Sequence, residues 1–152
     1  MAKSEKSLKT AIFTLVTIVL VIGIFLFNRT DRLALNTNSL TGLATLRSLA
    51  KEATPYSEAM TNGKPTLLEF YADWCTTCQG MAPIVKKMHQ QQGEKVNLVM
   101  LNVDAPQWQK QIENYQVTGI PQFTFLDSQQ QIIRTFVGKV PETVLNHLAF
   151  NI

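Results

Sequence analysis

The chain has 152 residues, of which 45% are hydrophobic, and its net charge is +3. This length suits one small domain with a single core beside an extra apolar segment. The positive charge does not predict a nucleic-acid-binding protein. From residue 56 onward seven basic residues are set against eight acidic ones, so the excess belongs to the N-terminal third.

Residues 8–27 are dominated by Ile, Val, Leu and Phe and carry a charge only at Lys9. A helix that rises about 1.5 Å per residue would cross a hydrocarbon core of about 30 Å over this length, so the segment is predicted to be a transmembrane anchor. A cleaved signal peptide is the alternative, but the apolar run is long and no small-residue cleavage site follows it. Lys3, Lys6 and Lys9 lie at the N-terminal side of the apolar run and two arginines follow it. This bias places the tail, residues 1–7, in the cytoplasm or its equivalent. The folded domain would then lie across the membrane.

Residues 28–54 are predicted to be a linker, with a polar loop at Asn36–Ser39. A short helix could form over four leucines spaced by three residues, Leu40, Leu43, Leu46 and Leu49. Because a strict three-residue spacing drifts around a helix of 3.6 residues per turn, it defines no clear face. The segment could be a spacer that packs on the domain, or one that lies near lipid.

The folded domain is predicted to span residues 55–152 and to begin with a short helix at 56–61, ended by Asn62-Gly63. A buried strand is expected at 66–72. The next helix ends near Gly93, and four of its residues recur at the spacing of one helix face: Met81, Ile84, Val85 and Met88. Pro83 lies inside this helix and is expected to kink it.

A second buried strand is expected at 96–103, followed by a helix that starts at 104–106. Two further strands, at 122–126 and 132–137, are joined by a hairpin turn at 127–130, and a final helix covers 141–150. A helix between the first two strands predicts that they are parallel with a right-handed crossover. The expected fold class is therefore α/β, a mixed central sheet flanked by helices.

Two cysteines, Cys75 and Cys78, follow the first strand directly and are the only ones in the chain. A C-x-x-C pair beside a strand–helix–strand pattern is typical of a redox motif. A zinc site would need four ligands, and the remaining candidates, His89 and His147, are remote in sequence. We therefore expect no metal.

Cys75 opens the predicted helix, where the helix dipole and free backbone N–H groups favour a thiolate, so it is the predicted nucleophile. Cys78 lies about one turn further and should be more buried, as suits the resolving thiol. Glu69 lies on the preceding apolar strand, and burial would raise its pKa, making it a plausible proton acceptor for Cys78. The alternative is that Glu69 points outward at the end of the strand.

Several motifs occur together at the spacing found in thioredoxins: Phe70–Cys78, Pro83, Leu101–Asp104 and Gly119–Pro121. The chain resembles thioredoxins over about residues 55–150. Within that superfamily it is similar to the membrane-anchored TxlA type of cyanobacteria and thylakoids. This resemblance implies a thioredoxin fold for the domain, with an N-terminal membrane helix.

The resemblance also implies that Pro121 is cis and faces the cysteines, so that Ile120 and Trp74 help to bind an extended substrate segment. It gives Glu69 the proton-acceptor role, although thioredoxins usually have Asp there. The lysine often found near this acid is replaced by Met100. Thr76-Thr77 stands where thioredoxins have Gly-Pro, which leaves the reduction potential open.

The function implied is a membrane-anchored protein-disulfide reductase with no cofactor beyond the redox-active Cys75–Cys78 disulfide. It would act in the thylakoid lumen or periplasm, receive electrons from a CcdA-like transmembrane donor, and reduce apocytochromes during cytochrome b6f maturation. Two alternatives stay open. One is an oxidant or isomerase of exported proteins, and the other is a non-catalytic binding module with the same fold.

Overall fold

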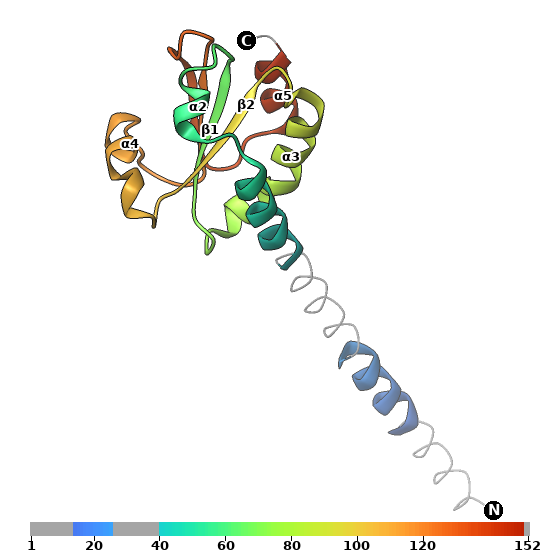
Figure 1. Ribbon diagram of the computed structural model, residues 1–152. Coiled ribbons are helices and arrows are strands. Elements are labelled where there is room, and N and C mark those ends of the chain that lie inside the picture. The colour runs from blue at the N-terminus through green and yellow to red at the C-terminus, as the bar shows by residue number, and fades with distance from the viewer. Residues whose placement is uncertain (1–13, 26–39, 151–152) are drawn as a thin grey trace, which may run out of the picture. The chain divides into compact units, whose positions relative to one another are not determined.

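The computed structural model describes residues 14–25 and 40–150, and the chain divides into two compact units between Asn38 and Ser39 (Figure 1). In the first unit residues 14–25 are helical, and every large apolar side chain among them is exposed. Within the two described ranges, no helix has both the length and the hydropathy needed to cross a membrane. The rest of the predicted anchor, residues 8–13 and 26–27, and the tail lie outside the described residues.

The second unit is built on one sheet of four strands, in the order β2-β1-β3-β4. The strands are β1 (Thr66–Tyr71), β2 (Asn97–Asn102), β3 (Gln122–Leu126) and β4 (Ile132–Val137). β1 and β2 are parallel, whereas β3 is antiparallel to both β1 and β4. The mixed central sheet expected from the sequence is confirmed.

From Tyr56 onward, the described residues form the helices α2 (Tyr56–Ala59), α3 (Thr76–Gln92), α4 (Gln109–Asn114) and α5 (Glu142–Phe150) and the 3₁₀ turn η1 (Pro106–Trp108). α3 continues through Pro83. The helix expected from residue 104 is divided, because a single 3₁₀ turn beginning at Pro106 precedes α4. A proline is tolerated at such a start because its missing N–H would have no partner there.

Two apolar clusters sandwich the sheet. α3 and α5 pack on one face, and α2, η1 and α4 pack on the other, as Figure 1 shows for α3, α5 and α4. Residues of β1 alternate between the two clusters: Leu67 and Tyr71 join the α3 side, while Leu68 and Phe70 join the α4 side. Since side chains alternate along a strand, Glu69 faces α3.

Residues 40–52, expected within a linker, form a helix of the second unit. Leu46 and Leu49 are fully buried in the same cluster as α3 and α5. The helix packs closely on α3, because a Cβ added at Gly42 would lie 2.7 Å from the carbonyl oxygen of Gln79. The folded unit therefore runs from Ser39 and is longer than the sequence-based domain that starts at residue 55.

Candidate redox site

The two cysteines lie where β1 passes into α3. The Cys75 N–H donates to the carbonyl oxygen of Ala72 at 3.2 Å, which closes a tight turn at the end of β1. Cys75 is the N-cap of α3, and its Sγ accepts a hydrogen bond from the Cys78 N–H at 3.0 Å. A sulfur in this position faces the positive end of the helix dipole. The geometry therefore favours a thiolate at Cys75 once the pair is reduced.

Cys75 and Cys78 are joined by a disulfide, with their Cα atoms 5.2 Å apart. The Cys75 residue is 6% exposed and Cys78 is fully buried. An incoming thiol or disulfide can therefore reach Cys75 more easily than Cys78. The expectation that Cys78 is more buried than Cys75 is met.

Glu69 is fully buried, so the alternative in which it points outward is excluded. Among the described residues, neither of its carboxylate oxygens has a hydrogen-bond partner. Burial raises the pKa of this carboxyl from 4.5 to about 8, because desolvation penalises the charged form. Glu69 thus faces the α3 side of the sheet with a proton affinity in the range where thiols titrate.

The peptide bond between Ile120 and Pro121 is cis, as the resemblance implied. Pro121 is buried, and its carbonyl oxygen accepts from the Gly138 N–H at 2.8 Å. Ile120 is partly buried and packs against both apolar clusters. The loop that carries Pro121 is therefore tied to the end of β4.

Trp74, the aromatic residue expected at the site, is exposed, with 66% of its surface accessible. Its indole Nε1–H donates to Oδ2 of Asp104 at 2.9 Å. An exposed ring held by a hydrogen bond offers a fixed apolar surface beside Cys75.

A cavity of about 270 Å³ lies beside the residues between the two cysteines, Thr76 and Thr77. Gly80, Met81 and Lys139 complete its lining. Neither Gly80 nor Lys139 was singled out from the sequence. The one sequence signal for Gly80 is its position inside an amphipathic helix. Glycine there destabilises the helix by about 1 kcal/mol relative to alanine, which points to a reason for its presence other than helix stability.

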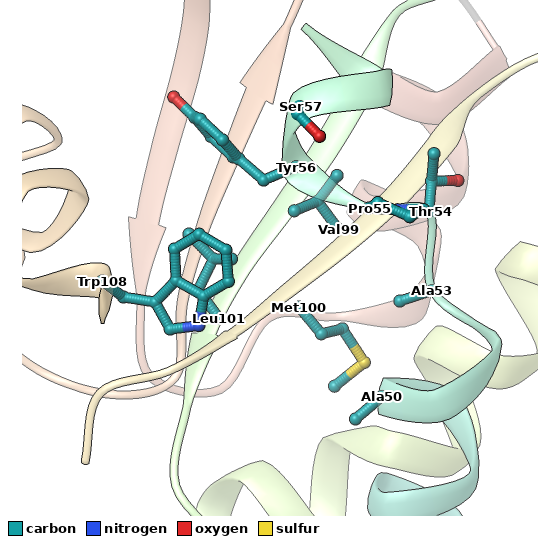
Figure 2. A pocket seen from close by; sticks show the side chains of 10 residues that line it. All are labelled: Ala50, Ala53, Thr54, Pro55, Tyr56, Ser57, Val99, Met100, Leu101 and Trp108. Carbon is teal, nitrogen blue, oxygen red and sulfur yellow. The ribbon is translucent and has the colours of Figure 1, made fainter. Parts of the chain in front are cut away.

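A larger cavity, of about 400 Å³, lies elsewhere (Figure 2). It is lined by Ala50 and Ala53, by the start of α2, by Val99–Leu101 of β2 and by Trp108. None of the residues expected at the redox site lines it.

Two contacts beside the cysteines were not expected, and both involve Asp73. Arg47, on the helix at 40–52, donates from Nε to Oδ2 of Asp73 at 2.8 Å and forms an ion pair with the same oxygen. Gln79 donates from Nε2 to the carbonyl oxygen of Asp73 at 2.7 Å. Local sequence patterns cannot indicate the first contact, because it joins residues 26 positions apart.

Comparison with known proteins agrees with this geometry. The family model described as Thioredoxin matches residues 47–149. The chain is 44% identical over 121 residues to the chloroplastic thioredoxin-like protein HCF164 of Oryza sativa subsp. japonica, an alignment that covers 80% of this chain and 43% of that protein. It is 46% identical over 102 residues to the thiol:disulfide interchange protein TxlA of Synechococcus elongatus, covering 67% and 53%.

A solved structure, the germline-specific thioredoxin Deadhead of Drosophila melanogaster, superposes with a TM-score of 0.56 at 27% identity, over 64% of this chain and 91% of that one. The chain spans about half the length of the two curated relatives above. The chain therefore belongs to the thioredoxin family, within which it is similar to TxlA-type proteins.

Proposed function

We propose that the chain is a membrane-anchored thiol–disulfide oxidoreductase that reduces disulfides in other proteins. The observation that carries this proposal is the Cys75–Cys78 pair at the N-terminus of α3, with Cys75 the more accessible sulfur. The reduced form would hold two thiols and deliver two electrons to each client disulfide, ending as the Cys75–Cys78 disulfide.

The exchange has two steps. The Cys75 thiolate attacks one sulfur of the client disulfide, which forms a mixed disulfide and releases the first client thiolate. Cys78 then attacks the Cys75 sulfur, which releases the second client thiol and closes the protein's own disulfide. Because Cys78 is fully buried, it must lose its proton inside the protein before it can attack.

Glu69 is the proposed acceptor of that proton. It lies on the α3 side of the sheet and is itself fully buried. A carboxyl group with a pKa of about 8 exchanges protons in the same pH range as a thiol, whereas an exposed Glu would be too weak a base. The proton passes from the Cys78 thiol to the Glu69 carboxylate, and Glu69 later returns it to solvent.

The client segment is proposed to bind in extended form beside Pro121. Proline has no N–H, and the backbone at Ile120 can pair with a strand-like segment. Trp74 supplies an exposed apolar surface beside it, and the cavity next to Thr76 and Thr77 can receive a client side chain.

The anchor, the compartment and the partners are also proposals. The apolar run at 8–27 and the exposed apolar side chains at 14–25 support insertion in a membrane. The flanking charges support a domain in the thylakoid lumen or periplasm. The similarity to the thiol:disulfide interchange protein TxlA supports protein disulfides as substrates. A CcdA-like electron donor and apocytochrome clients during cytochrome b6f assembly are proposed from the resemblance of the motifs alone.

Trapping of mixed disulfides tests the proposal. In the Cys78→Ser variant Cys75 can attack a client but nothing resolves the adduct, so client proteins should stay bound through Cys75. The matched control is the Cys75→Ser, Cys78→Ser double variant, which should trap none. If both variants recover the same proteins, the domain would be a binding module and the catalytic proposal would fail.

A further inference from the structure

Asp73 and Trp74 occupy the middle of the turn that leads Cys75 into α3, and side chains from three separate segments hold that turn. Asp104, after β2, accepts from the Trp74 indole. Gln79 of α3 donates to the Asp73 carbonyl oxygen, and Arg47 binds the Asp73 carboxylate. Arg47 is the one of the three that lies outside the predicted domain.

The helix that carries Arg47 is fixed in place. Its buried leucines, Leu46 and Leu49, share an apolar cluster with Cys75 and Cys78. Gly42 lies so close to Gln79 that a methyl group there would clash with the α3 backbone. Arg47 therefore reaches Asp73 from a rigid element, and the pairing does not depend on a flexible linker.

The charges around the turn give this pairing a chemical role. Asp73 lies two residues before Cys75, and a carboxylate near a sulfur opposes formation of a second negative charge. The other ionisable groups that border this region are Asp104, the buried Glu69, the Tyr71 phenol, and Lys139 in the cavity beside Thr76 and Thr77. Arg47 is the cation that contacts Asp73 directly.

The pKa of the Tyr71 phenol depends on these charges. Burial raises the pKa of its phenol, the charges of Asp73 and Glu69 raise it further, and the charge of Arg47 lowers it. A thiolate at Cys75 is an anion in the same region and should respond in the same sense.

We infer that Arg47 is a positioning residue for the redox reaction, which holds the Asp73 turn and cancels a charge that would otherwise oppose the Cys75 thiolate. The inference rests on the proposed function for its biological meaning, because it concerns the nucleophile of that reaction. It assigns a functional role to residues 40–52, which the sequence placed in a linker.

Alkylation of the full-length chain in detergent, with Cys78→Ser so that a single thiol reacts, tests this inference. The pH dependence of the iodoacetamide rate reports the Cys75 pKa. Arg47→Ala should raise that pKa by about half a unit, and Asp73→Asn should lower it by a similar amount, after allowance for the exposure of the pair. The Arg47→Ala, Asp73→Asn double variant should return close to the parent value, and Arg47→Lys should stay close to it.

Lys51→Ala is the matched control, because it removes an exposed cation from the same helix and should leave the Cys75 pKa unchanged. The difference between Arg47→Ala and the parent should also shrink in about 1 M salt, where the screening length falls to about 3 Å. A common shift in Arg47→Ala, Asp73→Asn and the double variant would show loss of structure alone and would overturn the inference. Client trapping by the parent is measured separately, so failure of the proposed function would be seen there.

Discussion

Glu69 of β1 lies opposite Met100 of β2 in the parallel register, so the buried carboxyl has a thioether beside it where many thioredoxins offer a lysine. Burial is the cause of the raised pKa of Glu69, and no cation among the described residues opposes it. Burial therefore makes the proposed proton acceptor an unusually weak acid and ties the stability of the fold to pH.

The first prediction concerns stability of the oxidised protein. Because the folded-state pKa of Glu69, about 8, exceeds the unfolded value of 4.5, its contribution is fully present below pH 4.5 and is lost as pH rises through about 8. The free energy of unfolding should therefore fall over this window, by about 5 kcal/mol at most. Urea denaturation across the window should show a much smaller fall for Glu69→Gln. An equal fall in both proteins would mean that Glu69 is not the group responsible.

The second prediction concerns Met100, the residue opposite Glu69 on β2. Met100→Lys places an ammonium beside the carboxyl and should lower the pKa of Glu69, because an opposite charge favours the ionised form. Carbon-13 NMR of the Glu69 carboxyl measures this directly. Met100→Leu is the control and should leave the pKa near 8. An unchanged pKa in Met100→Lys would show that the two side chains do not interact.

The third prediction concerns the helix at 40–52. Leu46 is fully buried, whereas Leu40 on the same helix is 69% exposed. Leu46→Ala should lower the free energy of unfolding by about 2–4 kcal/mol, as expected for a cavity in a core. Leu40→Ala should change it by less than about 0.5 kcal/mol. Similar small effects for both substitutions in chemical denaturation would place this helix outside the folded unit.

The fourth prediction concerns glycine-to-alanine substitutions in two helices, which should change the stability of the protein in opposite directions. A Cβ at Gly80 would meet nothing within 4 Å, so Gly80→Ala should stabilise α3 by about 0.5–1 kcal/mol through helix propensity. A Cβ at Gly42 would lie 2.7 Å from a backbone oxygen, so Gly42→Ala should destabilise by about 1–3 kcal/mol. Thermal unfolding of the two variants measures both. Stabilisation by Gly42→Ala would contradict the close packing of the helix on α3.

Much of the fold was predictable because the apolar residues within each strand and helix recur at the spacing typical of a buried face. The apolar runs of β1 and β2 and the helical spacing of Met81, Val85 and Met88 indicate their elements locally. Cys75, Cys78 and Pro121 were found by their motifs. β1 is antiparallel to β3, so the residues that follow β1 and the residue that precedes β3 lie at the same end of the sheet.

The helix at 40–52 and its contacts were harder to predict. Leucines every three residues define no helix face, and Leu46 and Leu49 are buried while Leu40 is not. The Arg47–Asp73 pair depends on how that helix docks against α3, which is a tertiary property. The lining of the cavity by Gly80 and Lys139 likewise joins residues far apart in the chain.

The reduction potential of the Cys75–Cys78 couple, measured by equilibration of the full-length chain with glutathione or dithiothreitol buffers, tests the central claim most directly. A reductase of exported proteins should have a potential near or below about −250 mV, close to the value of about −270 mV for thioredoxin. A potential near about −120 mV, the value of the oxidant DsbA, would mean that electrons flow from clients to this protein and would contradict the proposed reduction of apocytochromes.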